Sequence, residues 1–508
     1  MSKEQKLLNN LCRLLYRGAY KQFTAPCDIG AVQTDYLLRL LKKNADTVYG
    51  RSYQFDTIRS YADFAKKVPL TVYENYEPYI RDMGDGRRAV LTKEKVRLFE
   101  VTSGSSGGKK LIPYTRSLKQ EFGRGIRPWL YDIYTNVPGV DAGKSYWSLT
   151  PVTSKKRYAP CGIPIGFEED AQYFGFLEQG IMRRLFAVDG SVKFATDREA
   201  FYEETARQLL ACDCLTLISV WNPSFLTLLC DFMCEHKDIL AAGLTGGRKA
   251  VFLNAVAENR FDRLFSDLKL ISCWADAGAA SCTAPVRDRF PDVMIQPKGL
   301  LATECFVSFP LVGEEGARLS LYSHFFEFRS LDDGHIVTAE GLTRGTYELI
   351  VTTGGGFYRY CIGDIVEVLA VYPHAPPRIR FLGRGGICSD LFGEKLTEQF
   401  VEKALNSLRL SHCFCLLAPE GTHYCLYTTD THVTSEALDT ALCESYHYHY
   451  CRQLGQLTPA RIIPVKGNPR KAWMDRLAAD GMRLGDIKPS CLSKRSGWAD
   501  YFECLTRP

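Results

Sequence analysis

The spacing of hydrophobic and polar positions changes along the chain near residue 95. Before that point leucines recur at helical intervals, at Leu7, Leu8, Leu11, Leu14 and Leu15 and again within residues 34–43. Such spacing places apolar side chains on one face of a helix. A further helix is expected over residues 59–67. The first 95 residues are therefore predicted to be mostly helical.

After residue 95 short apolar strands alternate with helical stretches and loops. Residues 96–101 are typical of a strand, residues 102–110 of a Gly/Ser loop and residues 115–133 of a helix, so the loop is predicted to lie at a strand-to-helix turn. Alternation of this kind indicates α/β layers around a largely buried sheet. Further strands are expected over residues 146–149, 215–220, 268–274, 293–296, 319–328, 347–352 and 365–371.

Proline and glycine mark a candidate domain boundary. Pro373, Pro376 and Pro377 precede an expected strand at residues 379–382, and Gly383 follows it. Residues 1–382 are predicted to form a large N-terminal domain, and residues 383–508 a small C-terminal domain. The latter alternates helices and strands, with one helix expected over residues 435–454, as a small two-layer α+β domain does. The predicted fold class is α/β, with a large N-terminal domain and a small mobile α+β C-terminal domain.

Composition narrows the class of protein. The 508 residues are 46% hydrophobic and 24% charged, which is typical of a globular chain. A formal net charge of +5 over this length favours no nucleic acid and no membrane surface as partner. Polar residues interrupt the most apolar stretch, residues 209–234, before it reaches the ~18 apolar residues of a spanning helix.

The 19 cysteines are odd in number and scattered. The first six residues mix charges and do not resemble a secretory signal, which predicts a reducing, cytoplasmic setting in which thiols act as small buried hydrophobes. His447 and His449 lie near Cys443 and Cys451, but no C-x-x-C pairs accompany them. A metal site in this segment is therefore not favoured.

The loop at residues 102–110 has the composition of a phosphate site. It combines three glycines, three serines, a threonine and two lysines. Glycine lets the backbone approach an anion, hydroxyls and amides donate to its oxygens, and lysine adds charge. The spacing fits neither a Walker A loop nor G-x-G-x-x-G. Taken alone, a flexible Gly/Ser loop with solvated lysines explains it equally well.

Four further segments follow this loop in register, at residues 270–280, 298–304, 325–328 and 347–364. In this order and spacing, the set resembles the auxin-responsive promoter family of acyl-acid amido synthetases, the plant enzymes that conjugate jasmonate, auxin and benzoates to amino acids, together with their bacterial relatives. The resemblance runs from about residue 60 to the C-terminus. The family belongs to the adenylate-forming superfamily. This implies that residues 1–382 form a nucleotide- and acyl-binding N-terminal domain and residues 383–508 a mobile C-terminal domain.

The resemblance implies roles for two of these motifs. Ser103, Ser105, Ser106 and Lys109 match the family's first nucleotide motif, which holds the ATP phosphates. Ala302, Thr303 and Glu304 match the second, which lines the nucleotide and in which the glutamate helps bind Mg²⁺. A carboxylate is the hard oxygen ligand that magnesium prefers. The alternative for Glu304 is an ordinary surface carboxylate.

Tyr358 and Asp364 match the third motif. Its aspartate accepts hydrogen bonds from ribose hydroxyls, and its aromatic residue helps frame the adenosine. The chain departs from the family here. Where the family has Tyr-Arg-Val-Gly-Asp, this chain has Cys361 in place of the arginine, although Arg359 is near.

The expected hinge resembles the superfamily's crossover segment. By this resemblance Arg384 reaches the ribose, and Lys395 is the lysine that enters the active site when the C-terminal domain rotates. Lys488, which precedes a proline near the end, is a second candidate for a catalytic lysine. For either lysine, a solvated surface position is the alternative.

Together these residues predict a ligase that uses ATP and Mg²⁺. A carboxylic acid would attack ATP to give an acyl-adenylate and pyrophosphate, and an amine, expected to be that of an amino acid, would then displace AMP to form an amide. One alternative is an acyl-CoA or carrier-protein thioester synthetase with the same first step. A second is a degenerate adenylate-binding regulatory protein, which Cys361 keeps open. The sequence leaves the acid and the oligomeric state open and is compatible with a monomer.

Overall fold

The computed structural model describes residues 3–103, 109–148, 157–166, 176–195, 197–276, 283–385, 388–389, 391–392, 394, 396–453, 456–480, 482, 487 and 489–505. The chain folds into two compact units. The large unit comprises residues 1–221, 228–273 and 289–381, and the small unit comprises residues 222–227, 274–288 and 382–508. Because two short segments before residue 382 belong to the small unit, the predicted domain limits stay a prediction.

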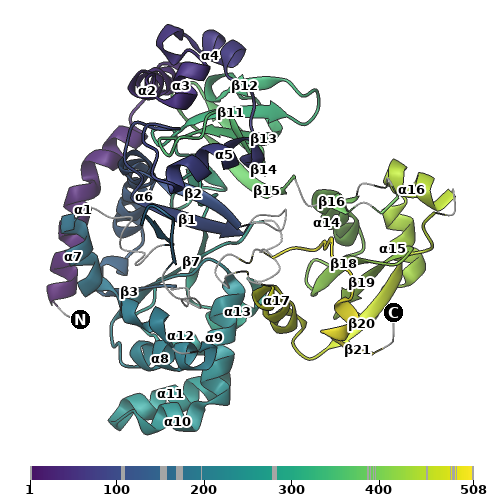
Figure 1. The fold of residues 1–508 in the computed structure, drawn as a ribbon. Helices are drawn as coiled ribbons and strands as arrows, with labels where there is room; N and C mark the ends of the chain where they lie inside the picture. The colour runs from purple at the N-terminus through teal and green to yellow at the C-terminus, as the bar shows by residue number, and fades with distance from the viewer. Residues whose placement is uncertain are drawn as a thin grey trace. The chain divides into compact units, whose positions relative to one another are not determined.

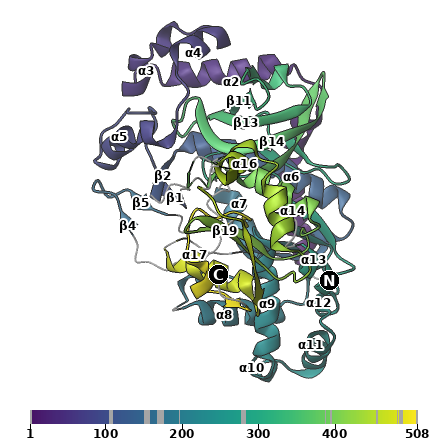
Figure 2. The same ribbon diagram turned by 90° about the vertical axis from the view of Figure 1, so that its right-hand side faces the viewer.

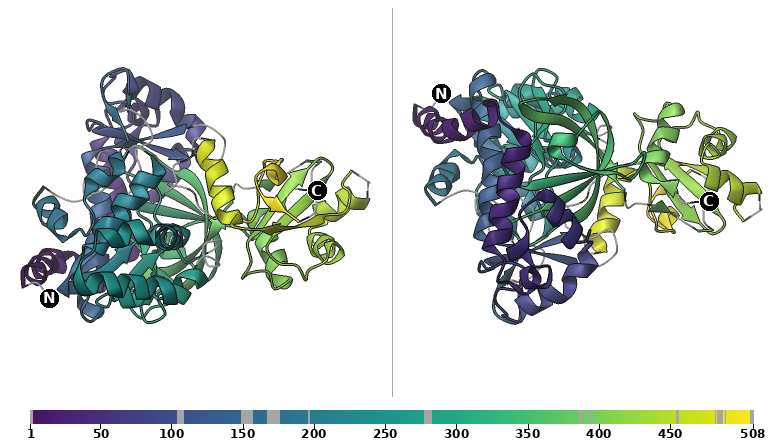
Figure 3. Two further views of the ribbon diagram at one scale, coloured as in Figure 1. Left: turned by 90° about the horizontal axis from the view of Figure 1, so that it is seen from below. Right: turned by 90° about the horizontal axis from the view of Figure 1, so that it is seen from above.

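The N-terminal part of the large unit is helical, as its leucine spacing predicts. Polar side chains cap several of these helices; Asp28, for example, accepts a hydrogen bond from the Ala31 amide at 2.8 Å. The N-terminal helix α1, purple in Figure 3, packs along α6, where the ring of Tyr20 lies 4.7 Å from that of Tyr131. The helices are α1 (Lys3–Thr24), α2 (Ile29–Lys43), α3 (Val48–Ser52), α4 (Tyr61–Lys67), α5 (Tyr73–Gly84) and α6 (Arg116–Asn136).

A parallel sheet forms the second part of the large unit. Its order is β3-β6-β7-β8, and every neighbouring pair is parallel. The strands β6 and β7 are buried along their whole length, which accounts for their uninterrupted apolar sequences. Because all four strands run the same way, their carboxyl ends meet at one edge. The strands are β3 (Lys144–Trp147), β6 (Leu215–Ser219), β7 (Leu270–Cys273) and β8 (Met294–Pro297).

Helices separate the strands of this sheet along the chain, as the predicted α/β alternation requires. They are labelled in Figure 1. Their bounds are α7 (Phe176–Leu185), α8 (Arg198–Leu210), α9 (Pro223–Glu235), α10 (Lys237–Ala242), α11 (Gly246–Glu258), α12 (Phe261–Leu264) and α13 (Ala284–Arg289).

A seven-stranded sheet has the order β12-β11-β13-β14-β15-β10-β9, and Figure 2 shows its central strands. The register of β13 against β14 shifts between Glu348 and Ile350. This β-bulge re-aims the side chains that follow it on β14. The strands are β9 (Ser308–Phe309), β10 (Ala317–Leu319), β11 (Phe325–Ser330), β12 (Ile336–Thr338), β13 (Gly345–Thr352), β14 (Tyr360–Tyr372) and β15 (Ala375–Arg384).

The Gly/Ser loop lies in a β-hairpin. Strands β1 (Leu98–Ser103) and β2 (Lys109–Tyr114) pair antiparallel, with Ser103 opposite Lys109. The predicted strand-to-helix turn is therefore wrong. The apolar residues before Tyr114 complete a second strand, and α6 begins only after Thr115, whose hydroxyl accepts a hydrogen bond from the Leu118 amide at 3.1 Å.

The small unit is of the α+β kind. Its sheet has the order β18-β19-β20-β21, and its core includes Leu417, Leu426, Leu438 and Tyr448. The single helix predicted over residues 435–454 is two, because a turn at residues 443–445 separates them. The elements are α14 (Glu398–Ser407), β18 (Cys415–Glu420), β19 (His423–Thr428), α15 (Ser435–Leu442), α16 (Tyr446–Gln453), β20 (Arg461–Lys466), α17 (Pro469–Ala479) and β21 (Glu503–Cys504).

The described residues contain neither a helix that could span a membrane nor a ready-made metal cluster. No helix among them has the length and hydropathy needed to cross a bilayer. No cluster of His, Cys, Asp and Glu in the same residues is arranged to hold a metal ion by itself.

Candidate active site

The structure places the predicted phosphate loop at the tip of the β1–β2 hairpin. Ser103 ends β1 and Lys109 begins β2, and the description of these two residues is limited to their backbone. Ser105 and Ser106 lie outside the described residues, as do Lys395 and Lys488. Arg384 ends β15, again with only its backbone described.

The second motif forms a tight turn beside this hairpin. The Ala302 amide donates to the Cys305 carbonyl at 3.0 Å, and the Cys305 amide donates to the Ala302 carbonyl at 3.3 Å. The Tyr114 hydroxyl, at the end of β2, donates to the Thr303 carbonyl at 2.7 Å. This bond ties the second motif to the strand that follows the phosphate loop. Tyr114 lies at the base of the hairpin, opposite Leu98, whereas Ser103 and Lys109 lie at the end that carries the loop.

The carboxylate of Glu304 is available for a ligand. Its side chain is 2% exposed, and it accepts no hydrogen bond from the part of the chain that the structure describes. The surface alternative for Glu304 is wrong, because the residue is buried. A carboxylate has the hard oxygen ligands that a divalent ion such as Mg²⁺ prefers.

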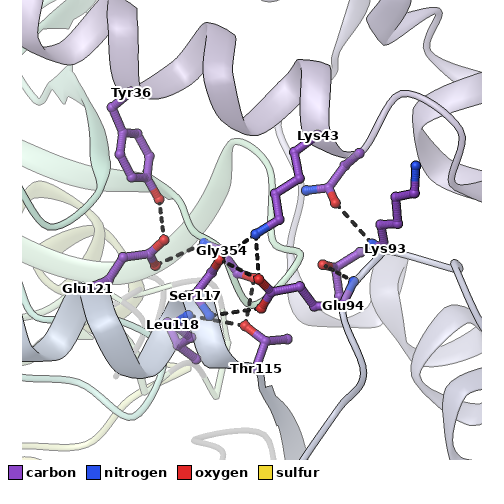
Figure 4. Close-up of polar contacts among 11 residues, drawn as sticks. Tyr36, Lys43, Lys93, Glu94, Thr115, Ser117, Leu118, Glu121 and Gly354 are labelled. Carbon is purple, nitrogen blue, oxygen red and sulfur yellow. Dashed lines mark hydrogen bonds and ion pairs between the residues drawn. The ribbon is translucent and has the colours of Figure 1, made fainter. Parts of the chain in front are cut away.

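A buried polar network holds the turn from behind. The Phe306 amide donates to His324 Nε2 at 2.9 Å, and His324 Nδ1 lies 3.1 Å from the Glu121 carboxylate. Glu121 also accepts from the Tyr36 hydroxyl at 2.7 Å and from the Gly354 amide at 2.9 Å, as Figure 4 shows for these two bonds. Burial, together with the Glu121 charge, raises the pKa of Tyr36 well above its ordinary value, so the phenol remains a donor.

Helix α6, which contains Glu121, and its N-cap residue Thr115 also bind the glycine turn that precedes the third motif. The Thr115 hydroxyl donates to the Gly354 carbonyl at 2.9 Å. A Cβ atom on Gly354 would lie 2.3 Å from a Glu121 carboxylate oxygen, so a larger residue does not fit there. The second and third motifs are thereby fixed to one element, α6.

Tyr358 lies in the core. Its side chain has no exposed surface, its ring stacks on Tyr49 at 5.1 Å, and its hydroxyl donates to the Leu91 carbonyl at 2.8 Å. Every polar and apolar part of the phenol is thus in contact with protein. This placement speaks against the predicted contact with adenosine.

Arg359 does not replace the arginine that Cys361 displaces. Its guanidinium binds the Glu327 carboxylate, with Nη2 at 2.8 Å from Oε1, while Nη1 donates to the carbonyls of Ala65 and Val68, each at 2.9 Å. Its backbone φ is 47°, a left-handed conformation rare outside glycine. The residue is committed to joining α4 to the seven-stranded sheet.

Cys361 brings no charge in place of the family arginine. Burial, and next the Glu348 carboxylate, raise the pKa of its thiol to about 11. The thiol is therefore protonated at neutral pH.

Asp364 follows Gly363 at the bulge in β14. Gly363 has φ of 79°, and nothing lies within 4 Å of where its Cβ would be, so the backbone conformation rather than lack of space requires glycine. Asp364 has no exposed surface. The bulge aims this carboxylate differently from that of a regular strand residue.

Lys298 is a buried polar residue that sequence reasoning gave no role. It lies directly after β8 and is 9% exposed. A single lysine in a sequence is mostly a surface residue. Its position between a predicted strand and Gly299 is the sequence signal that could have identified it. In the structure the φ angle of Gly299 is 73°.

Models of one protein family match most of the chain. The GH3 family N-terminal domain matches residues 20–250, the GH3 family central domain residues 318–384 and the GH3 family C-terminal domain residues 395–497.

Curated relatives are distant but of similar length. The 4-substituted benzoates-glutamate ligase GH3.12 of Arabidopsis thaliana is 22% identical, over 92% of this chain and 93% of its own. The probable indole-3-acetic acid-amido synthetase GH3.4 of Oryza sativa subsp. japonica is 26% identical, over 91% and 79%.

The fold matches that of a solved acyl acid amido synthetase structure. The structure of AtGH3.15 acyl acid amido synthetase in complex with 2,4-DB superposes with a TM-score of 0.83 at 18% sequence identity, covering 97% of this chain and 96% of that one. The predicted α/β fold with a smaller C-terminal domain is confirmed.

Proposed function

The chain belongs to the GH3 family, and we propose that it is an ATP-dependent acyl-acid amido synthetase that adenylates a carboxylic acid and transfers the acyl group to the amine of an amino acid. The resemblance that its sequence motifs indicated is thus confirmed. The observation that carries the proposal is the bond from Tyr114 to Thr303, because it joins the hairpin that carries the predicted phosphate loop to the turn that contains Glu304.

The proposed reaction has two steps. A carboxylate oxygen of the acid attacks the α-phosphorus of ATP, and pyrophosphate leaves. The amine nitrogen then attacks the acyl carbon, loses a proton, and AMP leaves with the oxygen that the acid contributed. Donors near the breaking bonds stabilise the negative charge that develops there.

We assign the binding of ATP to residues of the three motifs. Ser103, Ser105, Ser106 and Lys109 would hold the phosphates, and Asp364, with Arg384, would accept and orient the ribose hydroxyls. Ala302 and Thr303 would line the nucleotide. Glu304 would hold Mg²⁺, which supplies charge neutralisation for the phosphates when bound. Its burial without protein donors supports this role.

The small unit would supply the catalytic lysine. We propose Lys395, and Lys488 as a second candidate, for the group that reaches the reacting phosphate when residues 383–508 rotate as a domain. Replacing Lys395 with alanine should then slow adenylation, and a variant with wild-type rates would remove this assignment.

The relatives narrow the substrates. Their names specify indole-3-acetic acid in one case and 4-substituted benzoates with glutamate in another. We propose an aromatic carboxylic acid and an amino acid for this chain. We also propose a cytoplasmic location, because every cysteine whose side chain the structure describes is a free thiol.

Acid-dependent exchange of radiolabelled pyrophosphate into ATP tests the first step. A panel of indole-3-acetate, benzoates and aliphatic acids should contain at least one acid that supports exchange. Glu304→Gln should lower the exchange rate and weaken its dependence on Mg²⁺, whereas Glu348→Gln, which removes the carboxylate partner of Arg329, serves as the control. Absence of exchange with every acid would contradict the proposal.

Acceptors are then added to the acid that supports exchange. Amide formed with an amino acid supports the amido synthetase. Product formed with CoA and with no amine would identify the thioester synthetase instead.

A further inference from the structure

The carboxyl edge of the parallel sheet gathers an unusual set of side chains. Trp147 ends β3, Ser219 ends β6, and Lys298 directly follows β8. In open α/β sheets ligands bind at the carboxyl ends of the strands. The position of Lys298 is therefore one where the fold places ligand-binding groups.

The ammonium of Lys298 lies among three indole rings. Its Nζ is 5.0 Å from the ring centre of Trp221, 5.2 Å from that of Trp129 and 5.8 Å from that of Trp147. Indole faces attract a cation and present flat apolar walls. Trp129 and Trp147 are held in place, since their N–H groups donate to Gln296 and Ser145 at 3.2 and 3.0 Å.

The hydrogen-bonding capacity of Lys298 is largely unused. Nζ donates to the Ser219 hydroxyl at 2.7 Å, and the Ser272 hydroxyl is at the outer limit, 3.5 Å away. A lysine ammonium has three N–H donors. None of the carboxylates among the described residues is paired with it.

The surroundings of Lys298 make its charge costly without a partner. Burial lowers the pKa of Lys298 to about 7, and the Cys273 thiol is the one titratable group that acts against this shift. Among the described residues, the other groups that contact Nζ are the indoles of Trp129, Trp147 and Trp221 and the hydroxyls of Ser219 and Ser272, all of which are neutral. A negative charge arriving at this point would therefore be compensated by a protonated lysine.

We propose that Lys298, walled by Trp129, Trp147 and Trp221, is a binding site for the carboxylate of an aromatic or amino acid substrate. This inference rests on the proposed function. The carboxylate could be that of the acyl acid or the α-carboxylate of the acceptor amino acid, which share the chemistry of the contact. Lys298 then selects substrates and orients them, while the indoles exclude water from the ion pair.

Such a site couples binding to protonation. The carboxylate binds the charged lysine, so binding at pH 7 takes up about half a proton when the free site has a pKa near 7. Above pH 7 the affinity should fall about tenfold for each pH unit. A lysine with only a structural role would show neither effect.

The test uses the full chain and two probes, benzoate and L-glutamate, titrated separately. Calorimetry at pH 6–9, in buffers of different ionisation enthalpy, gives the dissociation constant and the proton uptake for each probe. Tryptophan fluorescence independently reports whether a probe occupies the site between Trp129, Trp147 and Trp221. We expect one probe to show both proton uptake and the loss of affinity at high pH, which identifies the source of the carboxylate.

Two variants complete the test. Methionine in Lys298→Met fills a similar volume. This variant should bind the responding probe at least tenfold more weakly at pH 6.5, and its affinity should no longer depend on pH. Lys269→Met, at the amino end of β7 in the same sheet, should change neither. Binding of neither probe, or binding that is independent of pH and of Lys298, would overturn the inference.

Pyrophosphate exchange separates this inference from the proposed function. Binding of both probes that is unchanged in Lys298→Met, together with normal acid-dependent exchange, would leave the amido synthetase standing and overturn the lysine site. Lysine-dependent carboxylate binding without exchange by any acid would do the reverse.

Discussion

Two buried cations in the large unit have opposite surroundings. Arg359 is 6% exposed and lies against the carboxylate of Glu327, which is 1% exposed, with backbone carbonyls taking its other donors. Lys298 is 9% exposed and has one short hydrogen bond, to a serine hydroxyl. A buried charge whose partners are all supplied by the protein belongs to the fold. A buried charge that lacks a counter-ion in the described residues marks a place for a ligand.

The strongest test of this contrast removes the partner of Arg359. Glu327→Gln leaves the guanidinium buried without its carboxylate and should lower the free energy of unfolding by about 3–5 kcal/mol. Urea denaturation followed by circular dichroism measures it. The control is Glu348→Gln, which weakens the pair with Arg329 in the same sheet; because the Arg329 side chain is 37% exposed, this loss should be smaller, about 1 kcal/mol. Equal losses in the two variants would contradict the distinction.

The pH dependence of stability tests Lys298 in the same way. Because burial lowers its pKa in the folded state to about 7, the unfolded chain binds more protons above that pH. The contribution of Lys298 to stability therefore rises with pH, by about 1.4 kcal/mol per unit between pH 7 and 9. Lys298→Met should be more stable than the wild type at pH 7, and this difference should shrink by about 2–3 kcal/mol at pH 9. A constant difference would mean that Lys298 is charged throughout.

Asp364 is the residue that we propose to bind the ribose hydroxyls of ATP. Asp364→Asn keeps the shape but removes the charge that would hold ribose hydroxyls, so the KM for ATP in pyrophosphate exchange should rise about tenfold or more. Its melting temperature provides the control for folding. An unchanged KM in a folded variant would remove Asp364 from the nucleotide site.

Tyr358 belongs on the fold side, six residues earlier in the same motif. Tyr358→Phe deletes the hydrogen bond to Leu91 and should cost about 1 kcal/mol of stability, with little change in the KM for ATP. Urea unfolding and pyrophosphate exchange on the same preparation measure both quantities. A raised KM with unchanged stability would reinstate the contact with adenosine.

The sequence was informative where the signal is local. Leucine spacing predicted the N-terminal helices, apolar runs predicted the parallel strands, and the ordered motifs indicated the family. The hairpin around the phosphate loop was missed, because residues 110–114 were assigned to no strand. Local composition does not say which strand pairs with which.

The rest of the candidate site depends on contacts between residues that lie far apart in the sequence. Arg359 and Glu327 are 32 residues apart in sequence, and Lys298 and Ser219 are 79 apart. No periodic pattern reveals such pairs. The sequence therefore could not distinguish Arg359, which has a carboxylate partner, from Lys298, which has none among the described residues. It likewise placed Tyr358 at the nucleotide because motif position does not report burial.

The transfer of oxygen from acid to AMP tests the central claim most directly. An acid that supports exchange is labelled with ¹⁸O in both carboxylate oxygens and incubated with the enzyme, ATP, Mg²⁺ and the accepted amino acid. Mass spectrometry should find one ¹⁸O atom in AMP and one in the amide, because the acid attacks phosphorus and the amine attacks carbon. Unlabelled AMP formed together with the amide would contradict the adenylation mechanism.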